Sequence, residues 1–395
     1  MSERAEARID LAALRHNCGV LRDMLAPGVE LCPVLKADGY GHGAPWCAEA
    51  VADAGADRIA VATAREAAQI RTAVPDLPLL TLGALTSSEA DLAVSVGTDV
   101  GVWDRSFVGA LSSRAQAAGK KLGVHVKYDT GMGRLGVRPD EAAGLCARAS
   151  EAGVLAGLMS HFATADEEDT AFFELQLGRF TELAAGLKAR YPSLLCHTAN
   201  SAATLRGPRA HFDMVRTGIA MYGLAPANDD PFLHDLRPAM KLVSHLAGVR
   251  EVGPGDSVGY GRTWIADEDT RIGVVPVGYA DGVRRALGNI GEVLVAGRRC
   301  PIVGRISMDQ MTVRLPGGWG RPGDEVVLFG AAGDGVAGGA SVAWTWPSAP
   351  RRDGRERPRI LCEEVAALLG TINYEVTCDV APRVVRRYRG EAPAE

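Results

Sequence analysis

Short apolar segments alternate with alanine-rich, helix-like stretches along the first part of the chain. Each segment is rich in leucine or β-branched residues and is followed by turn residues, which is the pattern of repeated βα units. Eight such units predict a (β/α)8 barrel, an α/β fold. The eight segments are 31–37, 58–63, 77–83, 99–103, 122–129, 155–162, 195–200 and 212–219.

The character of the sequence changes near Pro238. Beyond it, short strand-like runs such as RIGVVPVGYA, GEVLVAG and EVVLFG are separated by glycine and proline, which is typical of an all-β domain. We therefore expect two domains, the barrel over residues 1–237 and a mainly-β domain over residues 238–395. Near the end of the chain we expect a helix over 362–369 and a strand at INYEV, 372–376.

Residues 331–359 fit neither domain. They run from a glycine- and alanine-rich tract through WTWPSAP to RRDGRERPR, and neither half resembles the sequence around it. We interpret the segment as a surface loop or a disordered insertion. It is either a species-specific loop or the trace of a local reading-frame error in the coding sequence.

The balance of charges argues against a nucleic-acid or membrane partner. The 395 residues include 43 basic and 48 acidic side chains, so no excess of positive charge is available for a polyanion. The eight cysteines are scattered without a CxxC pair, and we expect no bound metal. The N-terminus lacks an apolar signal-peptide core and no run of about 18 apolar residues occurs, so we expect a cytoplasmic protein.

Reactive side chains gather where the predicted barrel strands end. Because active sites of such barrels lie at the carboxyl ends of the strands, these side chains are candidates for chemistry. They are Lys36, Arg134, His161, Asn200, Ser201 and Arg216. Lys36 follows an apolar run, where a charged side chain costs free energy unless it is solvated, paired or catalytic. A lysine at the rim of the barrel is an equally good explanation.

Two short motifs after the last two predicted strands could bind a phosphate group. Asn200-Ser201-Ala202 and Thr217-Gly218-Ile219 offer hydroxyls and backbone N–H groups. A lysine together with a phosphate site suggests pyridoxal phosphate, which needs both. Each motif alone is explained as well by a turn glycine or a serine at a helix cap.

Longer motifs run in order through nearly the whole chain. The barrel part contains VLKADGYGHGA at 34–44, KYDTGMGRLG at 127–136, SHFA at 160–163, NSA at 200–202 and VRTGIAMYG at 215–223. The second part contains GYGRT at 259–263, GYADG at 278–282, GRISMDQ at 304–310 and INYE at 372–375. In these motifs the sequence resembles the bacterial alanine racemases, which are fold type III enzymes dependent on pyridoxal 5′-phosphate.

The resemblance implies racemisation of alanine by two acid/base groups, supplying D-alanine for peptidoglycan. Lys36 would hold the cofactor and serve one face of the substrate, and Tyr260 of the partner subunit would serve the other, which requires a homodimer. His161 and Arg216 would support the tyrosine, although from sequence alone a histidine satisfied within the core is the more usual case. Arg216 would also face the pyridine nitrogen and leave it unprotonated, because a guanidinium does not readily give up its proton.

The resemblance also assigns the remaining binding residues. Cofactor contacts would come from Lys36, Tyr40, His161, Asn200, Ser201, Arg216, Gly218, Ile219 and Tyr374. Substrate contacts would come from Arg134, Met308, Tyr279 and Asp309. Lys127 occupies the position of a lysine that is often carbamylated in the family.

Four alternatives remain open at this stage. The first is a racemase of another small amino acid such as serine. The second is a decarboxylase of the same architecture, which Arg216 opposes because such enzymes favour a protonated pyridine. The third, a barrel that binds the cofactor without turnover, has no use for Tyr260. The last is a dinucleotide site at GMGRLG, 131–136, which lies in the fifth βα unit instead of the first.

Overall fold

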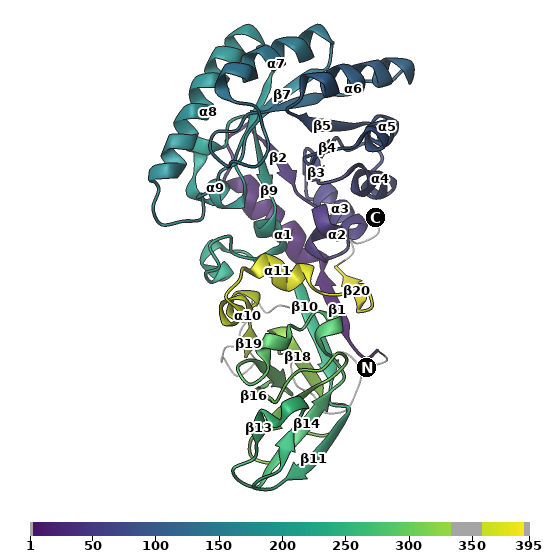
Figure 1. The fold of residues 1–395 in the computed structure, drawn as a ribbon, viewed down its shortest axis with the longest axis vertical. Helices are drawn as coiled ribbons and strands as arrows, with labels where there is room; N and C mark the ends of the chain where they lie inside the picture. Colours follow the sequence, from purple (N-terminus) through teal and green to yellow (C-terminus); the bar gives the residue numbers. More distant parts are fainter. Residues whose placement is uncertain (1–2, 333–357, 391–395) are drawn as a thin grey trace. The chain divides into compact units, whose positions relative to one another are not determined.

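The computed structural model describes residues 3–332 and 358–390, so residues 333–357 of the atypical segment lie outside the described part. The chain divides into two compact units (Figure 1). The barrel unit comprises Leu14–Met221 and His234–Leu236. The β-rich unit comprises Met1–Ala13, Tyr222–Leu233 and Arg237–Glu395.

Eight parallel strands form the centre of the barrel unit. They are β2 (Glu30–Pro33), β3 (Ile59–Val61), β4 (Leu79–Thr81), β5 (Thr98–Val102), β6 (Val124–Lys127), β7 (Leu155–Met159), β8 (Leu195–His197) and β9 (Met214–Thr217). Strands β3 to β8 form one sheet in sequence order, and β2 pairs with β9. A bridge between Val34 and Ala60 joins β2 to β3, and the Arg216 N–H donates to the Ala199 carbonyl at 2.9 Å beside β8. Each of the eight segments expected from the sequence overlaps one of these strands, so the predicted barrel is confirmed.

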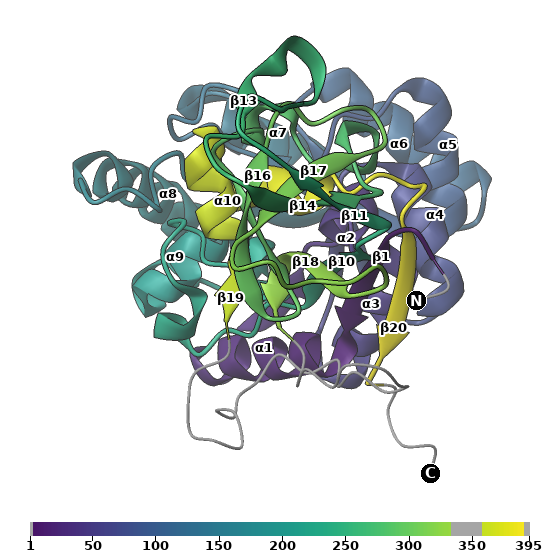
Figure 2. The same ribbon diagram turned by 90° about the horizontal axis from the view of Figure 1, so that it is seen from below.

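The helices of the barrel unit bury apolar side chains, many of them alanines, against the strands. They are α1 (Leu11–Asp23), α2 (Lys36–Tyr40), α3 (Ala44–Asp53), α4 (Ala64–Ala73), α5 (Ser87–Val96), α6 (Arg105–Ala117), α7 (Pro139–Glu151), α8 (Ala171–Arg190) and α9 (Ser201–Arg206). Helices α4 and α5 each begin with a capping box, in which a threonine and a glutamate satisfy each other's free N–H groups. Figure 2 shows α4, α5 and α6 adjacent around the barrel.

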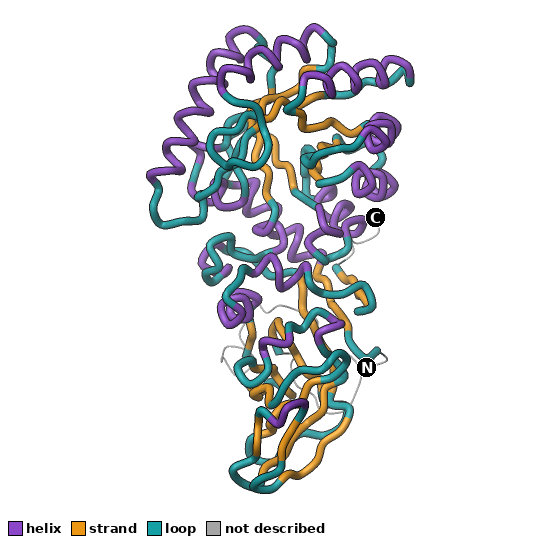
Figure 3. The backbone as a smooth tube through the Cα atoms, in the orientation of Figure 1, coloured by secondary structure: helices purple, strands orange, loops and turns teal. Residues whose placement is uncertain are grey.

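The β-rich unit is built mainly from antiparallel strands. They are β1 (Glu6–Asp10), β10 (Met240–His245), β11 (Gly248–Val252), β12 (Ser257–Val258), β13 (Trp264–Ile265), β14 (Thr270–Val275), β15 (Glu292–Val295), β16 (Arg298–Val303), β17 (Met311–Leu315), β18 (Glu325–Ala331), β19 (Arg359–Ile360) and β20 (Val385–Arg389). The long sheet has the order β11-β14-β17-β16-β15-β18-β10-β1-β20. In Figure 3, helices surround the strands of the barrel unit, whereas loops join most strands of the β-rich unit.

The N-terminal strand belongs to the β-rich unit, whereas the boundary expected from the sequence assigns residues 1–237 to the barrel. Strand β1 pairs antiparallel with β10 and parallel with β20, and Ala7 and Ile9 are fully buried there (Figure 2). The barrel already has its eight strands, so β1 satisfies its backbone groups in the other sheet.

The C-terminal region contains helix α10 (Cys362–Leu369), as expected, but INYEV is not a strand. It lies in helix α11 (Asn373–Cys378), where the buried Asn373 amide donates to the Ala225 carbonyl at 2.7 Å and to Glu363 at 2.8 Å. These tertiary bonds outweigh the β-propensity of a short segment. The ends of the atypical segment are paired: Ala331 of β18 lies opposite Arg359 of β19. Among the described residues no helix has both the length and the apolar character of a membrane span.

Candidate active site

Lys36 lies three residues after the first barrel strand, β2, and begins the unusual turn assigned as α2. The four residues after it, Ala37 to Tyr40, all have φ between 52° and 63° and so form a left-handed turn. Each non-glycine residue in this conformation costs about 1–2 kcal/mol. The Ala37 N–H donates to the Glu66 carboxylate and the Ala44 N–H to Asp38, both at 2.8 Å, and these bonds help hold the turn. Lys36 is an exposed residue, and its ammonium lies 5.8 Å from the Tyr40 ring centroid.

The phenol of Tyr40 lies against the backbone of Gly218. A Cβ atom at position 218 would be only 2.4 Å from the Tyr40 Oη, so only glycine leaves room for this approach. The neighbouring Thr217 hydroxyl is buried and has no hydrogen-bond partner among the described residues. Ser201 is also buried, and its hydroxyl accepts the Ala220 N–H at 3.3 Å. This cradle of hydroxyls and amides can hold an anionic group.

Asn200 and Ile219 flank the cradle in different ways. The Asn200 side chain caps helix α9 by accepting the Ala203 N–H at 3.0 Å. Its carboxamide oxygen therefore has a structural partner already. Ile219 is fully buried and begins a short 3₁₀ turn, Ile219–Tyr222, directly after Gly218.

Arg216 lies buried on β9 with carbonyl and imidazole partners. Its guanidinium donates to His197 Nδ1 at 2.5 Å, to the Ser160 carbonyl at 2.7 Å and to the Thr198 carbonyl at 3.3 Å. Burial lowers the pKa of Arg216 to about 10, so it remains charged at neutral pH. His161 Nδ1 lies 3.5 Å from the guanidinium. Burial, together with the charge of Arg216, holds the pKa of His161 well below its usual range, and the imidazole is neutral.

Lys127 ends β6 and is buried beside other cations. Burial, followed by the charges of Arg216 and Arg134, lowers the pKa of Lys127 to about 8. A large share of this amine is therefore unprotonated just above neutral pH. Its ammonium lies 5.9 Å from the Trp103 ring centroid.

Arg134 is exposed on a tight loop that follows Lys127. The Asp129 carboxylate accepts the N–H groups of Gly131 at 3.0 Å and Gly133 at 3.1 Å, and Gly136 fits only without a side chain because a Cβ there would lie 2.7 Å from the Asp129 nitrogen. These bonds close the GMGRLG loop on itself. The dinucleotide alternative therefore has no support, because the amides it needs are already bonded to Asp129.

The structure brings together the barrel residues that the sequence singles out. The positive charges of Lys36, Lys127, Arg134 and Arg216 all act on His161 and depress its pKa, which places these groups near one another at the carboxyl ends of β2, β6, β7 and β9. Such a cluster can hold anionic groups and can transfer protons through an amine or an imidazole.

Several residues in this part of the barrel escape prediction from sequence. Gln176 of α8 is fully buried, accepts the Ala163 N–H at 2.8 Å and donates to the His161 carbonyl at 3.1 Å, so it fixes the loop that carries His161. Glu66 shows one signal, the T-x-x-E capping box. His197 and His125 are polar side chains within otherwise apolar strands, which is the signal that could have identified them.

Three of the residues expected from the β-rich part lie on two loops that contact each other. The Tyr279 N–H donates to the Ser307 carbonyl at 3.1 Å, and the next N–H, from Ala280, donates to the Met308 carbonyl at 3.0 Å. Arg383 joins the buried Asp281 to Asp309, at 2.7 and 2.8 Å. The structure therefore brings Tyr279, Met308 and Asp309 together.

Tyr260 and Tyr374 lie elsewhere in the same unit. Tyr260 is 72% exposed, between two glycines, Gly259 and Gly261, that both have φ of 74°. Its phenol is therefore available for contact beyond its own chain. Tyr374 is half-buried on α11.

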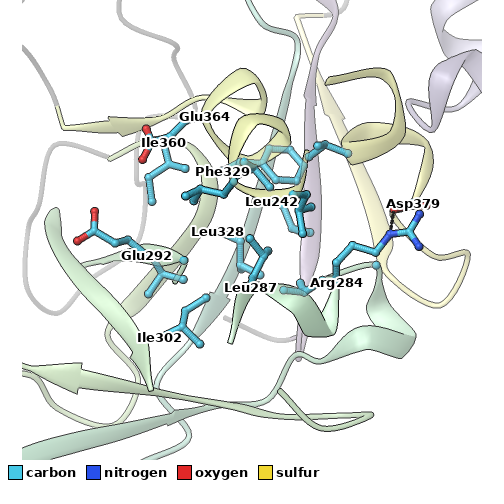
Figure 4. Close-up of a pocket in the computed structure, with 18 of the residues that line it drawn as sticks. Leu242, Arg284, Leu287, Glu292, Ile302, Leu328, Phe329, Ile360, Glu364 and Asp379 are labelled. Atoms are coloured by element: carbon cyan, nitrogen blue, oxygen red, sulfur yellow. Dashed lines mark hydrogen bonds and ion pairs between the residues drawn. The ribbon is translucent and has the colours of Figure 1, made fainter. Parts of the chain in front are cut away.

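A separate cavity in the β-rich unit is mostly apolar (Figure 4). Side chains such as Leu242, Leu328 and Phe329 line it, and its charged rim is paired, with Arg284 bonded to Asp379. None of the residues expected in the site from the sequence lines this cavity. It therefore offers no chemistry comparable to that of the barrel cluster.

Comparison with known proteins identifies one family throughout. The family model "Alanine racemase, N-terminal domain" matches residues 9–226, and "Alanine racemase, C-terminal domain" matches residues 239–346. The alanine racemase of Desulfovibrio desulfuricans is 42% identical over 389 residues, which covers 97% of each chain. That of Streptomyces coelicolor is 41% identical and covers 98% of this chain and 96% of the relative.

Solved structures agree with the sequence comparison. The alanine racemase from the D-cycloserine producer Streptomyces lavendulae has a TM-score of 0.87 at 35% identity, covering 99% of this chain and 98% of that one. The Bacillus anthracis alanine racemase with bound L-Ala-P has a TM-score of 0.85 at 33% identity, covering 99% and 96%.

Proposed function

The chain belongs to the alanine racemase family, and we propose that it interconverts L-alanine and D-alanine with pyridoxal 5′-phosphate as its cofactor. As a member of this family it is an isomerase that acts on an amino acid. The observation that carries the proposal is the cluster of Lys36, Lys127, Arg134, His161 and Arg216 at one end of the barrel.

The residues of the barrel unit fit this cofactor. The Thr217 hydroxyl, buried and without a partner among the described residues, and the backbone at Gly218, which no side chain covers, offer polar groups suited to a phosphate. The remaining phosphate contacts would come from Ser201, Tyr40, Ile219 and Tyr374. Arg216 has only N–H donors, so it would hold the pyridine nitrogen by a hydrogen bond without protonating it. Lys36 would hold the cofactor, whose chemistry when bound would be to take up the electron pair left by loss of the substrate α-proton.

Two groups on opposite faces would move the proton. Lys36 would serve one face and Tyr260 of the partner subunit the other, so the substrate need not turn over. A tyrosine with an ordinary pKa near 10 is a poor base and needs support. The neutral imidazole of His161, itself held beside Arg216, would supply that support by hydrogen bonding.

The substrate carboxylate would be bound by Arg134 and the Met308 backbone amide. Tyr279 and Asp309 would narrow the entrance and favour a small side chain. Lys127 would be carbamylated: its pKa of about 8 leaves the neutral amine that reaction with carbon dioxide requires. The resulting negative charge would offset the positive charges of Arg134 and Arg216 beside it.

We infer a homodimer with a composite site in each half. The support is the exposed Tyr260, which is 72% accessible on its own chain. We place the enzyme in the cytoplasm, supplying D-alanine for peptidoglycan. The eight cysteines are all free thiols and seven of them are buried, as expected of a protein from a reducing compartment.

The circular dichroism of alanine tests the proposal directly. The purified chain loaded with pyridoxal 5′-phosphate should reduce the signal of L-alanine, and separately that of D-alanine, to zero while the concentration of alanine stays constant. A stable signal from both enantiomers, with the cofactor bound through Lys36, would contradict it. Loss of alanine with release of carbon dioxide would indicate a decarboxylase instead.

A further inference from the structure

A chain of buried polar side chains crosses the interior of the barrel behind Arg216. Arg216 on β9 contacts His197 at the end of β8, at 2.5 Å. His197 Nε2 lies 2.8 Å from His125 Nδ1 on β6, and His125 Nε2 lies 3.6 Å from an Asp99 carboxylate oxygen on β5. Both histidines are fully buried. No role in binding or proton transfer described above requires His197, His125 or Asp99.

The chemistry of Arg216 fixes the proton on each histidine. A guanidinium has only donors, so His197 Nδ1 must accept and must carry no proton. A neutral His197 then carries its proton on Nε2, and this N–H donates a hydrogen bond to His125 Nδ1. His125 in turn carries its proton on Nε2, which faces the Asp99 carboxylate. Every donor in the chain therefore points from Arg216 toward Asp99.

Asp99 is held as the negative end of this chain. Its carboxylate accepts from Arg58 at 2.7 Å and from the Gly123 N–H at 2.8 Å. Burial alone would raise the pKa of Asp99, but His125, Arg58 and Gly123 outweigh it and lower the pKa to about 2. The 3.6 Å contact with His125 is longer than an ordinary hydrogen bond. It still selects the tautomer, because the opposite one would direct a lone pair at a carboxylate.

Two glycines create the space that the chain needs. Gly157 on β7 pairs in register with His125, and a Cβ there would lie 2.3 Å from His125 Nδ1, the atom that accepts from His197. A Cβ at Gly123 would lie 2.5 Å from the Asp99 carboxylate. Neither glycine has a positive φ, so the backbone does not require them. The barrel interior is shaped around these polar groups in a place where apolar side chains usually pack.

We propose that Asp99 and His125 are positioning residues that act through His197 to hold the guanidinium of Arg216. With the protons ordered in this way, His197 presents a lone pair to Arg216. With the order reversed, or with His197 charged, it would present an N–H to a cation and push the guanidinium from its place. The charged groups around His197 are Arg216 and Arg58, and burial together with these charges keeps its pKa well below the usual range.

The inference rests on the proposed function only for its catalytic consequence. If Arg216 holds the pyridine nitrogen, a displaced guanidinium impairs the chemical step more than it impairs binding of alanine. The order of the protons, in contrast, depends only on the row of polar side chains from Arg216 to Asp99 and not on the reaction. The two can therefore be tested separately.

Nitrogen-15 NMR of the imidazole groups tests the proton order directly. The full-length protein loaded with pyridoxal 5′-phosphate is labelled at histidine, and the signals are assigned with His125→Gln and His197→Gln variants. We expect both histidines to be neutral, with the proton on Nε2, from about pH 5 to pH 8, across the range in which an ordinary histidine titrates. A proton on Nδ1 of His197, or a charged His197 at neutral pH, would overturn the proposal.

Asp99→Asn tests the effect on Arg216. In either orientation of the asparagine, its NH₂ group replaces a carboxylate oxygen and faces an N–H group. That N–H group belongs to Gly123 in one orientation and to Arg58 and His125 in the other. The negative charge that ends the row of polar side chains is also lost. We expect a second tautomer of His197 to appear and kcat to fall by about tenfold with KM for alanine within about twofold, as when a group that orients a metal ligand is removed. The matched control is Thr81→Val, which removes the buried 3.1 Å bond between the hydroxyls of Thr81 and Thr98. The Thr98 hydroxyl also donates to the Asp99 backbone carbonyl, so this control disturbs the backbone beside Asp99 but leaves the Asp99 carboxylate and its side-chain partners in place.

The outcomes separate the two proposals. If Asp99→Asn keeps the wild-type tautomers and the wild-type kcat, or if Thr81→Val lowers kcat equally, Asp99 does not act through His197. If Asp99→Asn does not fold, the proposal is tested by the tautomers of His197 and His125 in the wild-type protein. If the wild-type protein shows the expected tautomers but does not racemise alanine, the proposed function fails and the proton order stands.

Discussion

Arg216 places a full positive charge inside a barrel, where an unpaired charge costs several kcal/mol. Its partners are two carbonyls and two imidazoles, all of them neutral. The pKa of Arg216 falls only to about 10, so the cation persists. A group that stays charged and cannot accept a proton is suited to hold a pyridine nitrogen in its unprotonated form.

Gly218→Ala should weaken cofactor binding. The added Cβ would meet the Tyr40 phenol at 2.4 Å, and overpacking of this kind costs about 1–3 kcal/mol, so affinity for pyridoxal 5′-phosphate should fall by about fivefold or more. Absorbance titration with pyridoxal 5′-phosphate measures this affinity. Gly144→Ala, which adds a methyl group to open space on α7, is the control and should leave affinity unchanged. Equal affinities in both variants would contradict the proposal that the cofactor phosphate binds beside Gly218.

Lys127→Met should stabilise the fold most below pH 8. The pKa of Lys127 is about 8 in the folded chain, against 10.5 ordinarily, so the charged amine costs on the order of 3 kcal/mol. Between these values the unfolded chain binds the extra proton, and the free energy of unfolding of the wild type rises with pH. Urea unfolding in bicarbonate-free buffer should therefore show a gain from Lys127→Met that shrinks from pH 8 upward. A gain that does not change with pH would contradict the lowered pKa.

Candidate site residues at strand ends were predictable, because active sites of barrel enzymes lie at the carboxyl ends of the strands. Lys36, His161 and Arg216 follow or end apolar segments, and the structure places them together. A histidine within an apolar strand marks position 125, but the contacts of His125 and Asp99 were not predictable, because they depend on which strands are neighbours and on the missing side chain of Gly157. No spacing in the sequence reveals that geometry.

At the scale of elements, helix α4 holds the turn that carries Lys36. Glu66 accepts the N–H groups of Ala37, Ala62 and Thr63, at 2.8 to 3.0 Å. The same carboxylate thus begins a helix and fixes a left-handed turn. Glu89 of α5 forms an equivalent capping box but accepts no bond from the turn after Lys36.

Glu66→Gln and Glu89→Gln form a matched pair. Glu66 accepts N–H groups with both carboxylate oxygens, so Glu66→Gln should lose about 1 kcal/mol of unfolding free energy, because an amide nitrogen would face one of those N–H groups. Glu89 uses one oxygen only, and a glutamine there keeps the capping box, so Glu89→Gln should change the unfolding free energy little. Only Glu66→Gln should also lower kcat, by about tenfold or more, because it loosens the turn that aims Lys36. Thermal unfolding and the racemisation rate provide both readouts. Equal kcat values in the two variants would show that Glu66 serves only as a helix cap.

Some elements escaped prediction for identifiable reasons. The segment INYEV alternates like a strand, yet it is helical because the buried Asn373 binds Ala225 and Glu363, which are distant in sequence. Strand β1 joins the β-rich sheet because its partners, β10 and β20, come from much later in the chain. Long-range pairing of this kind is invisible to local pattern.

At the scale of the whole molecule, the proposed site needs two copies of the chain. Lys36→Ala and Tyr260→Phe should each be inactive alone. Mixed and allowed to exchange subunits, they should recover about one quarter of wild-type activity, because half of the dimers are hybrids with one intact site. Sedimentation analysis of the same mixture checks that dimers form. No recovery from exchanged dimers would mean that Lys36 and Tyr260 act within one subunit.

The central claim is that two different groups serve the two faces of the substrate. Proton NMR of L-alanine and D-alanine in deuterium oxide with Tyr260→Phe tests it most directly. Because Lys36 remains, this variant should exchange the α-hydrogen of one enantiomer with solvent and leave the other untouched, with no racemisation. Exchange of both enantiomers at similar rates, or racemisation at the wild-type rate, would show that a single group serves both faces.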